Sequence, residues 1–263
     1  MKFEGTRRSF TLTLGSGIVL SALAIPLRSQ TTRSQPGGIT NRLRARAVAP
    51  VKSPAPAGLH SLNVREQRDT QVYIPEAASK FAKAPLVLSL HGATQGADRG
   101  ISLLRAQADE FGFVLVAPAS VDTTWEIEGA WGADRDNIDN SLALSFGLRD
   151  IDPARIAIAG FSDGASYSLS LGLCNGDLFN AVLGFSAGYI ANGPRTGKPP
   201  VFLSHGTDDP IFPINVTGRL LERTLKDNGY AVTFRQFEGR HTLPPDVAAT
   251  AMRWMLAAPP MSV

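Results

Sequence analysis

The segment Gly160-Phe161-Ser162-Asp163-Gly164 constrains the fold more than any other part of this chain. It follows the apolar run 155–159 and precedes small residues that suit a helix. A G-x-S-x-G sequence in that position predicts a tight strand-to-helix turn, in which the flanking glycines let backbones approach closely. Such a turn projects the Ser162 hydroxyl above the edge of a sheet, beside the N–H groups of a helix N-terminus. Ser162 is therefore a candidate acyl-transfer nucleophile.

Predicted strands and helices alternate along the rest of the chain. Alternating or continuous apolar runs predict strands at 71–74, 86–90, 113–117, 155–159, 182–185, 201–204 and 232–237. Helical spacing of apolar residues predicts helices around 101–111 and 138–146, from the turn to about 174, from 215 to about 226, and over 247–254. This order favours an α/β fold with a mostly parallel, doubly wound sheet. Catalytic groups then belong at the carboxyl ends of the strands.

Two later strand ends carry the partners that a serine nucleophile needs. A serine hydroxyl is a weak nucleophile at neutral pH and requires a base within hydrogen-bonding distance. His241, after the last strand, is the candidate base, and a carboxylate after the preceding strand would orient its ring. The pattern H-G-x-x-D-x-x-x-P favours Asp209 over its neighbour Asp208. The sequence Asp-Asp-Pro is also ordinary turn chemistry, so this assignment stays open at the sequence level.

Two loops complete the predicted site. The segment 91–96 ends an early strand, and its Ala93 N–H is expected to form an oxyanion hole with the N–H of Asp163. The Asp163 side chain itself is expected to be a first-turn acid that favours its helix dipole. Trp125 and Trp131 follow another strand end, where they either line a substrate pocket or anchor the loop as partly buried side chains.

Charge is divided unevenly along the chain. Residues 1–58 carry nine Lys and Arg against one acid, whereas residues 59–263 carry 17 basic and 22 acidic side chains. An acidic domain has no general attraction for nucleic acid or anionic membranes. The single cysteine, Cys174, excludes an intramolecular disulfide, and the sequence has no Cys/His cluster that indicates a metal site.

The basic N-terminal part is typical of an export signal followed by a spacer. Lys2, Arg7 and Arg8 precede a moderately apolar stretch, and 6–12 resembles the twin-arginine export motif. We expect a signal peptide at 1–27, a disordered Pro-rich linker at 28–58 and a catalytic domain at 59–263. The expected location is periplasmic or secreted, with the twin-arginine machinery as partner and no stable membrane anchor after cleavage. An uncleaved anchor is the alternative.

Taken together, these motifs resemble the bacterial phospholipase/carboxylesterase family over roughly residues 70–257. The likeness rests mainly on 151–167, 175–179, 204–207 and 239–242. It implies an α/β-hydrolase fold, and the roughly 205 residues after the spacer predict a minimal form without a large lid. It also implies hydrolysis of small-molecule carboxylic esters through Ser162, Asp209 and His241, with no cofactor or metal.

One segment and one general consideration leave alternatives open. The segment 91–95 is similar to the H-G-C-T-Q loop of polyhydroxybutyrate depolymerases and feruloyl esterases, with Ala93 in place of their cysteine. Polyester or feruloyl ester hydrolysis is therefore an alternative substrate assignment. A non-catalytic binding protein on a hydrolase scaffold is a third reading, because a fold does not guarantee a function.

Overall fold

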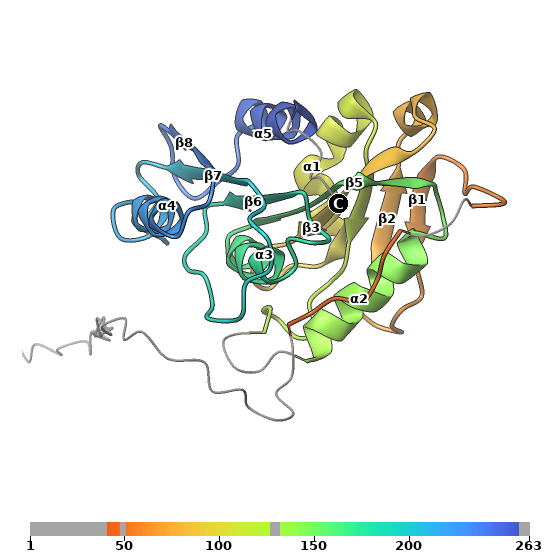
Figure 1. Cartoon of the computed structure of the whole chain (residues 1–263), viewed down its shortest axis with the longest axis horizontal. Coiled ribbons are helices and arrows are strands. Elements are labelled where there is room, and N and C mark those ends of the chain that lie inside the picture. The colour runs from red at the N-terminus through yellow and green to blue at the C-terminus, as the bar shows by residue number, and fades with distance from the viewer. Residues whose placement is uncertain (1–40, 48–50, 127–131, 258–263) are drawn as a thin grey trace, which may run out of the picture. The chain divides into compact units, whose positions relative to one another are not determined.

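A twisted sheet of eight strands runs through the part of the chain that the structure describes, in the order β1-β2-β4-β3-β5-β6-β7-β8 (Figure 1). The computed structural model describes residues 41–47, 51–126 and 132–257. The strands are β1 (Gly58–Ser61), β2 (Gln71–Ile74), β3 (Ala84–Leu90), β4 (Val114–Ala117), β5 (Ile151–Phe161), β6 (Ala181–Phe185), β7 (Val201–Gly206) and β8 (Val232–Phe237). β3 to β8 run parallel, and β2 pairs antiparallel with both β1 and β4.

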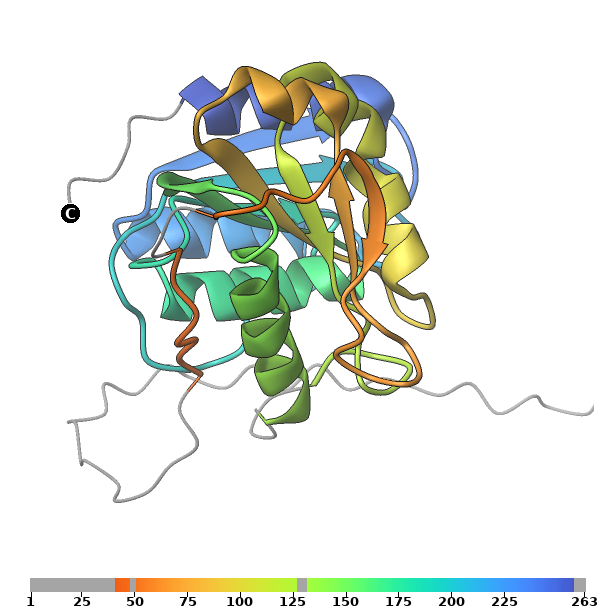
Figure 2. The same cartoon turned by 90° about the vertical axis from the view of Figure 1, so that its right-hand side faces the viewer.

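Helices cover both faces of the sheet, as Figures 1 and 2 show. They are the 3₁₀ helix η1 (Glu76–Lys80) and the α-helices α1 (Ala97–Phe111), α2 (Ala133–Ser145), α3 (Asp163–Cys174), α4 (Gly218–Asp227) and α5 (Pro245–Ala257). Side chains of β5 alternate between two hydrophobic clusters, because successive residues of a strand point to opposite faces. Ile156 and Ile158 pack with α2, α3 and α4, whereas Ala157 and Ala159 pack with α1 and α5. The predicted mostly parallel α/β fold is confirmed.

Differences from the predicted elements lie at edges and irregular positions. The short edge strand β1 and the 3₁₀ helix η1 were not predicted, because neither has a periodic apolar pattern. β5 begins at Ile151, four residues before the predicted start at Arg155. Its pairing with β3 shifts register between Ala84 and Leu86, where β5 passes through Pro153. A proline is accommodated in a strand only at such an edge or irregularity, which concealed this part of β5 in the sequence.

The predicted disordered linker over 28–58 is wrong for residues 41–47, which pack on the domain. Leu43 is 2% exposed, and its N–H donates to the Asn175 side-chain carbonyl at 2.8 Å. Asp139 accepts the N–H groups of Arg44 and Ala45 at 2.7 and 2.8 Å. Further along, the Ala55 N–H donates to the Leu148 carbonyl at 2.8 Å, and 58–61 form β1. These contacts come from distant residues, so the local polar composition did not reveal them.

The helices of the described part are short for a membrane span. Within 41–47, 51–126 and 132–257, no helix combines the length and the apolar character that crossing a bilayer requires.

Candidate active site

Ser162 lies in a strained turn between β5 and α3. Its backbone has φ 58° and ψ −118°, a left-handed φ that residues other than glycine seldom adopt. Such a conformation costs of the order of 1–3 kcal/mol and persists only where the surroundings hold it. Here the Ser162 N–H donates to the Phe185 carbonyl at 2.9 Å, and the Ser162 carbonyl accepts from the Ala165 N–H at 3.0 Å. The turn is thus tied both to β6 and to the first turn of α3.

Two glycines of the G-x-S-x-G sequence make this turn possible. A Cβ atom on Gly160 would overlap the carbonyl oxygen of Gly164, and one on Gly164 would overlap the carbonyl oxygens of Leu90 and His91. The neighbouring atoms are backbone, so a side chain at either position could be admitted only by moving β3 or the turn itself. The close approach at Gly164 also brings the end of β3 against the turn that carries Ser162.

His241 bridges Ser162 and Asp209 across the carboxyl ends of β5, β7 and β8. Its Nδ1 lies 2.6 Å from Asp209 Oδ2, and its Nε2 lies 2.8 Å from Ser162 Oγ. With Nδ1–H donating to the carboxylate, Nε2 carries the lone pair that accepts the serine proton. The structure therefore brings together the three residues that the sequence predicted. Asp208 is exposed and takes no part in this chain of hydrogen bonds.

The Asp209 carboxylate is held by donors on both oxygens. Oδ1 accepts the N–H groups of Ile211 and Phe212 at 2.8 and 2.9 Å, and His205 Nε2 lies 3.2 Å from Oδ2. Burial alone would raise the pKa of Asp209, but the hydrogen bonds from His241 and the two backbone N–H groups outweigh it and lower that pKa. The group consequently stays ionised and oriented toward His241.

The loop after β3 packs directly against Ser162. A Cβ atom on Gly92 would lie 3.6 Å from Ser162 Cβ, and the Gly92 N–H donates to Gln95 Oε1 at 3.1 Å. Thr94 has φ 64°, and its N–H donates to the Thr123 carbonyl at 2.6 Å. Neither the Ala93 N–H nor the Asp163 N–H donates to any residue of the described part. Both predicted oxyanion-hole donors therefore remain available next to Ser162.

The part of the chain that carries this arrangement matches a known protein family. The family model described as Phospholipase/Carboxylesterase matches residues 125–255, a segment that contains Ser162, Asp209 and His241. The chain belongs to this family. Acyl-protein thioesterase 1 of Gibberella zeae is 32% identical over 106 residues, which cover 36% of this chain and 45% of that protein. The chain thus spans about half the length of the curated relatives it matches.

Solved structures extend the family likeness to the fold. The crystal structure of esterase PE8 superposes with a TM-score of 0.57 at 23% identity, covering 70% of this chain and 96% of that one. The Bacillus cereus carboxylesterase gives 0.57 at 18% identity, covering 72% and 93%. At these identities the likeness shows the α/β-hydrolase fold, in agreement with the observed sheet.

Trp125 is buried, so its predicted substrate contact is wrong. The side chain is 1% exposed, and its Nε1–H donates to the His91 carbonyl at 2.8 Å. Its ring stacks on Tyr167 at 5.4 Å, and its backbone N–H donates to Asp163 Oδ2 at 3.0 Å. Trp125 therefore anchors the loop behind the site, which was the other reading of the sequence. Trp131 lies outside the described residues.

The Asp163 side chain does more than favour the helix dipole. Burial raises the pKa of its carboxyl, and the N–H of Trp125 opposes that rise. Because Asp163 accepts this hydrogen bond from Trp125, its side chain links the first turn of α3 to the loop that follows β4. This contact holds the loop against the turn that carries Ser162.

His91 braces the loop after β3 as a neutral imidazole. Its Nε2 accepts the Ser120 N–H at 2.9 Å, so its Nδ1–H donates to the Gly92 carbonyl at 2.7 Å. Burial lowers the pKa of His91, which keeps the ring uncharged in this role. Burial likewise lowers the pKa of His205, whose Nε2–H donates to the Phe212 carbonyl at 2.8 Å. Neither ring is placed to act as the base.

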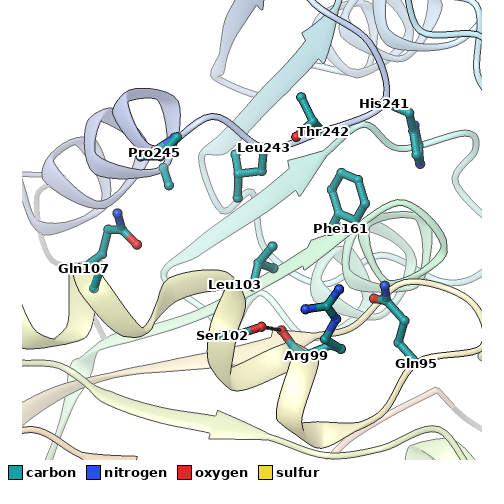
Figure 3. Close-up of a pocket in the computed structure, with 12 residues that line it drawn as sticks. Gln95, Arg99, Ser102, Leu103, Gln107, Phe161, His241, Thr242, Leu243 and Pro245 are labelled. Carbon is teal, nitrogen blue, oxygen red and sulfur yellow. Dashed lines mark hydrogen bonds between the residues drawn. The ribbon is translucent and has the colours of Figure 1, made fainter.

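A cavity of about 400 Å³ opens beside His241, between α1 and the loop that leads to α5 (Figure 3). Its walls include Phe161 and His241 from the site and Arg99, Leu103 and Gln107 from α1. Sequence reasoning missed these three residues of α1. The available signal was their spacing of four, which places two polar side chains and a leucine on one face of a helix.

Proposed function

We propose that this protein is a serine hydrolase that cleaves carboxylic esters through Ser162, His241 and Asp209 by way of an acyl-enzyme. The observation that carries the proposal is His241, whose ring nitrogens lie 2.8 Å from Ser162 Oγ and 2.6 Å from Asp209 Oδ2. A binding protein on the same scaffold needs neither the strained serine turn nor a continuous chain of hydrogen bonds from serine through histidine to aspartate. Membership of the phospholipase/carboxylesterase family supports the same reaction class.

Acylation begins when Ser162 Oγ attacks the ester carbonyl carbon. The serine proton moves to His241 Nε2, and Asp209 stabilises the resulting imidazolium. The carbonyl oxygen becomes an oxyanion, for which the N–H groups of Ala93 and Asp163 are the proposed donors. Collapse of the tetrahedral intermediate breaks the bond to the alcohol oxygen, and His241 gives its proton to that oxygen. The alcohol leaves, and the acyl group remains on Ser162.

Deacylation repeats these steps with water. His241 Nε2 removes a proton from a water molecule, whose oxygen attacks the acyl carbonyl carbon. The second tetrahedral intermediate releases Ser162 Oγ, which takes the proton back from His241. One ester and one water thus yield one acid and one alcohol. Thioesters can follow the same steps with a thiol as leaving group, and the names of the matched relatives make them a second candidate substrate class.

Labelling by a fluorophosphonate tests this proposal directly. The folded protein is expected to turn over 4-nitrophenyl butyrate and to lose that activity as one probe molecule attaches per chain. Peptide mass spectrometry should find the probe on Ser162, because His241 activates only this hydroxyl. Protein unfolded in denaturant is the control and should stay unlabelled. A folded protein that neither hydrolyses the ester nor carries the probe on Ser162 would overturn the proposal.

We also propose that the enzyme is exported by a twin-arginine pathway to a periplasmic or secreted location. The support is the sequence of 6–12, with Arg7 and Arg8 ahead of an apolar stretch. Expression of the full chain in bacterial hosts with and without a functional twin-arginine translocase tests this. We expect extracytoplasmic esterase activity only where the translocase works, and its loss when both arginines become lysine. Equal export in both hosts would exclude the twin-arginine route.

A further inference from the structure

The cavity beside the triad runs along one face of α1. Arg99, Leu103 and Gln107 all line it and are spaced by four residues, so they extend over about 12 Å of helix. Figure 3 shows Arg99 at the end near Gln95, Leu103 in the middle and Gln107 at the far end, toward Pro245. Phe161 and Leu243 line the cavity on the side opposite α1. A ligand in this cavity therefore meets polar groups at two ends and apolar groups between them.

Arg99 supplies the permanent charge of the cavity. No aspartate or glutamate lines the cavity, although α1 also contains Asp98, Asp109 and Glu110. Within the described residues, the Arg99 guanidinium forms no ion pair and no hydrogen bond, whereas Arg105 on the same helix stacks over the Tyr73 ring at 4.5 Å. An arginine without a partner at the wall of a cavity is suited to an oxyacid anion, which its planar donors match in pairs.

Two glutamine amides add uncharged hydrogen-bonding groups. Gln95 Oε1 accepts the Gly92 N–H, which leaves the Gln95 NH₂ group free to donate toward the cavity. The Gln107 side chain is 7% exposed, and its amide makes no hydrogen bond to any described residue. Because Gln107 lines the cavity, its amide is open to a ligand or to water. Gln107 thus offers a second polar side chain to a ligand in this cavity.

The position of His241 identifies the part of the substrate that enters. His241 must pass its proton to the oxygen of the leaving alcohol, so that alcohol lies next to its ring. His241, Thr242 and Leu243 form one wall of the cavity. The cavity is therefore placed to receive the alcohol part of an ester whose acyl carbon is bonded to Ser162.

We propose that the preferred substrates are esters whose alcohol part carries a carboxylate, and that Arg99 binds this carboxylate with help from Gln95. The inference rests on the proposed ester hydrolysis and specifies its substrate class. Arg99 is a specificity-determining residue in this account, and Gln107 contacts a second polar group in longer alcohols. A carboxylate fits better than a phosphate monoester, because one guanidinium and neutral amides balance one negative charge rather than nearly two.

Acetate esters of ω-hydroxy acids test the proposal. Acetoxy acids with two to six carbons in the acid chain are compared with the corresponding uncharged amides, and acetate release is followed at constant pH. For at least one chain length, we expect kcat/KM for the acid to exceed that for the amide by about 10-fold or more, mainly through a lower KM. Scanning the chain length finds the spacing at which the carboxylate reaches Arg99.

Substitutions in α1 assign the preference to one side chain. R99Q is expected to reduce the acid-to-amide ratio to about one, and R99E to reverse the selectivity so that acetylcholine is preferred over the acid. R105Q is the matched control, since Arg105 lies on the same helix outside the cavity, and it should keep the wild-type ratio. Thermal unfolding of each variant confirms that it is folded.

The outcomes separate this inference from the function on which it rests. Equal rates for acids and amides at every length, with acetate still released, would overturn the inference and leave ester hydrolysis intact. If no acetate ester and no 4-nitrophenyl ester is cleaved, the proposed function itself fails. An Arg99-dependent preference for 2-acetoxyethyl phosphate over every acid would replace the carboxylate by phosphate. A further outcome is an Arg99-dependent preference for 4-nitrophenyl hemiglutarate over 4-nitrophenyl butyrate, with no preference among the acetate esters. It would show that Arg99 binds a carboxylate on the acyl part and would overturn the inference.

Discussion

Replacing Ser162 by alanine is expected to lower kcat for 4-nitrophenyl butyrate by about 10⁴- to 10⁶-fold. The variant keeps the proposed oxyanion donors and the cavity but loses the atom that forms the acyl-enzyme in the proposed mechanism. His241 can then activate only water, which is not held at the 2.8 Å separation found for Ser162 Oγ. The residual rate should stay above the uncatalysed rate, because binding and oxyanion stabilisation remain. Initial rates at saturating ester, with wild-type contamination excluded by probe labelling, measure the effect.

Ser186 offers a matched control for this substitution. It lies directly after Phe185, whose carbonyl accepts the Ser162 N–H, and it also has a positive φ of 55°. Its hydroxyl is buried and makes no hydrogen bond to the described residues. Ser186→Ala therefore removes a serine hydroxyl beside the turn without removing a known interaction, and it should keep activity within a few-fold. Retention of more than a tenth of wild-type activity by Ser162→Ala would exclude Ser162 as nucleophile.

The site could be predicted where local sequence and strand topology agree. Ser162 was recognisable because β5, the glycines and α3 follow one another without interruption, and backbone overlap requires glycine at 160 and 164. His241 and Asp209 were recognisable because parallel strands bring their carboxyl ends to one edge of the sheet. The choice of Asp209 over Asp208 needed the structure. Both are aspartates in the same turn, and they differ only in where their side chains point.

Other features depended on contacts that no local pattern records. Trp125 appeared to be a rim residue because it follows a strand end, but its polar atoms are satisfied by His91 and Asp163, which are distant in sequence. Leu43 lies among polar and basic neighbours, and only the contact with Asn175 reveals its burial. In both cases the burial depends on contacts with residues more than 30 positions away, which the neighbouring sequence does not indicate.

The cavity along α1 illustrates a third kind of miss. Arg99 and Gln107 follow the spacing of one helix face, but polar residues at such spacing usually form the solvated side of a helix. What distinguishes them is the 400 Å³ space between α1 and the segment after His241, which arises from two elements about 140 residues apart. Specificity residues are therefore harder to predict than the catalytic residues, because their role depends on which element faces them.

Replacing Asp209 by asparagine is expected to lower kcat by about 10⁴-fold while leaving the fold intact. The asparagine carbonyl can still accept the N–H groups of Ile211 and Phe212, which now bond to Oδ1 at 2.8 and 2.9 Å. Its NH₂ group then faces His241 Nδ1 and donates to it, which places the imidazole proton on Nε2. In that tautomer Nε2 cannot accept the Ser162 proton. The loss should therefore appear in kcat, with KM little changed.

Asp208→Asn is the matched control, because it makes the same chemical change one residue earlier. Asp208 is exposed, and its carboxylate accepts only a long hydrogen bond of 3.4 Å from Thr207. This variant should keep wild-type kcat within about twofold, since a solvated carboxylate contributes little. Hydroxide can also replace the base. Activity of the Asp209→Asn variant should therefore keep rising with pH in the range where wild-type activity no longer changes. If Asp208→Asn were the slow variant and Asp209→Asn the active one, the carboxylate that orients His241 would belong to Asp208 instead of Asp209.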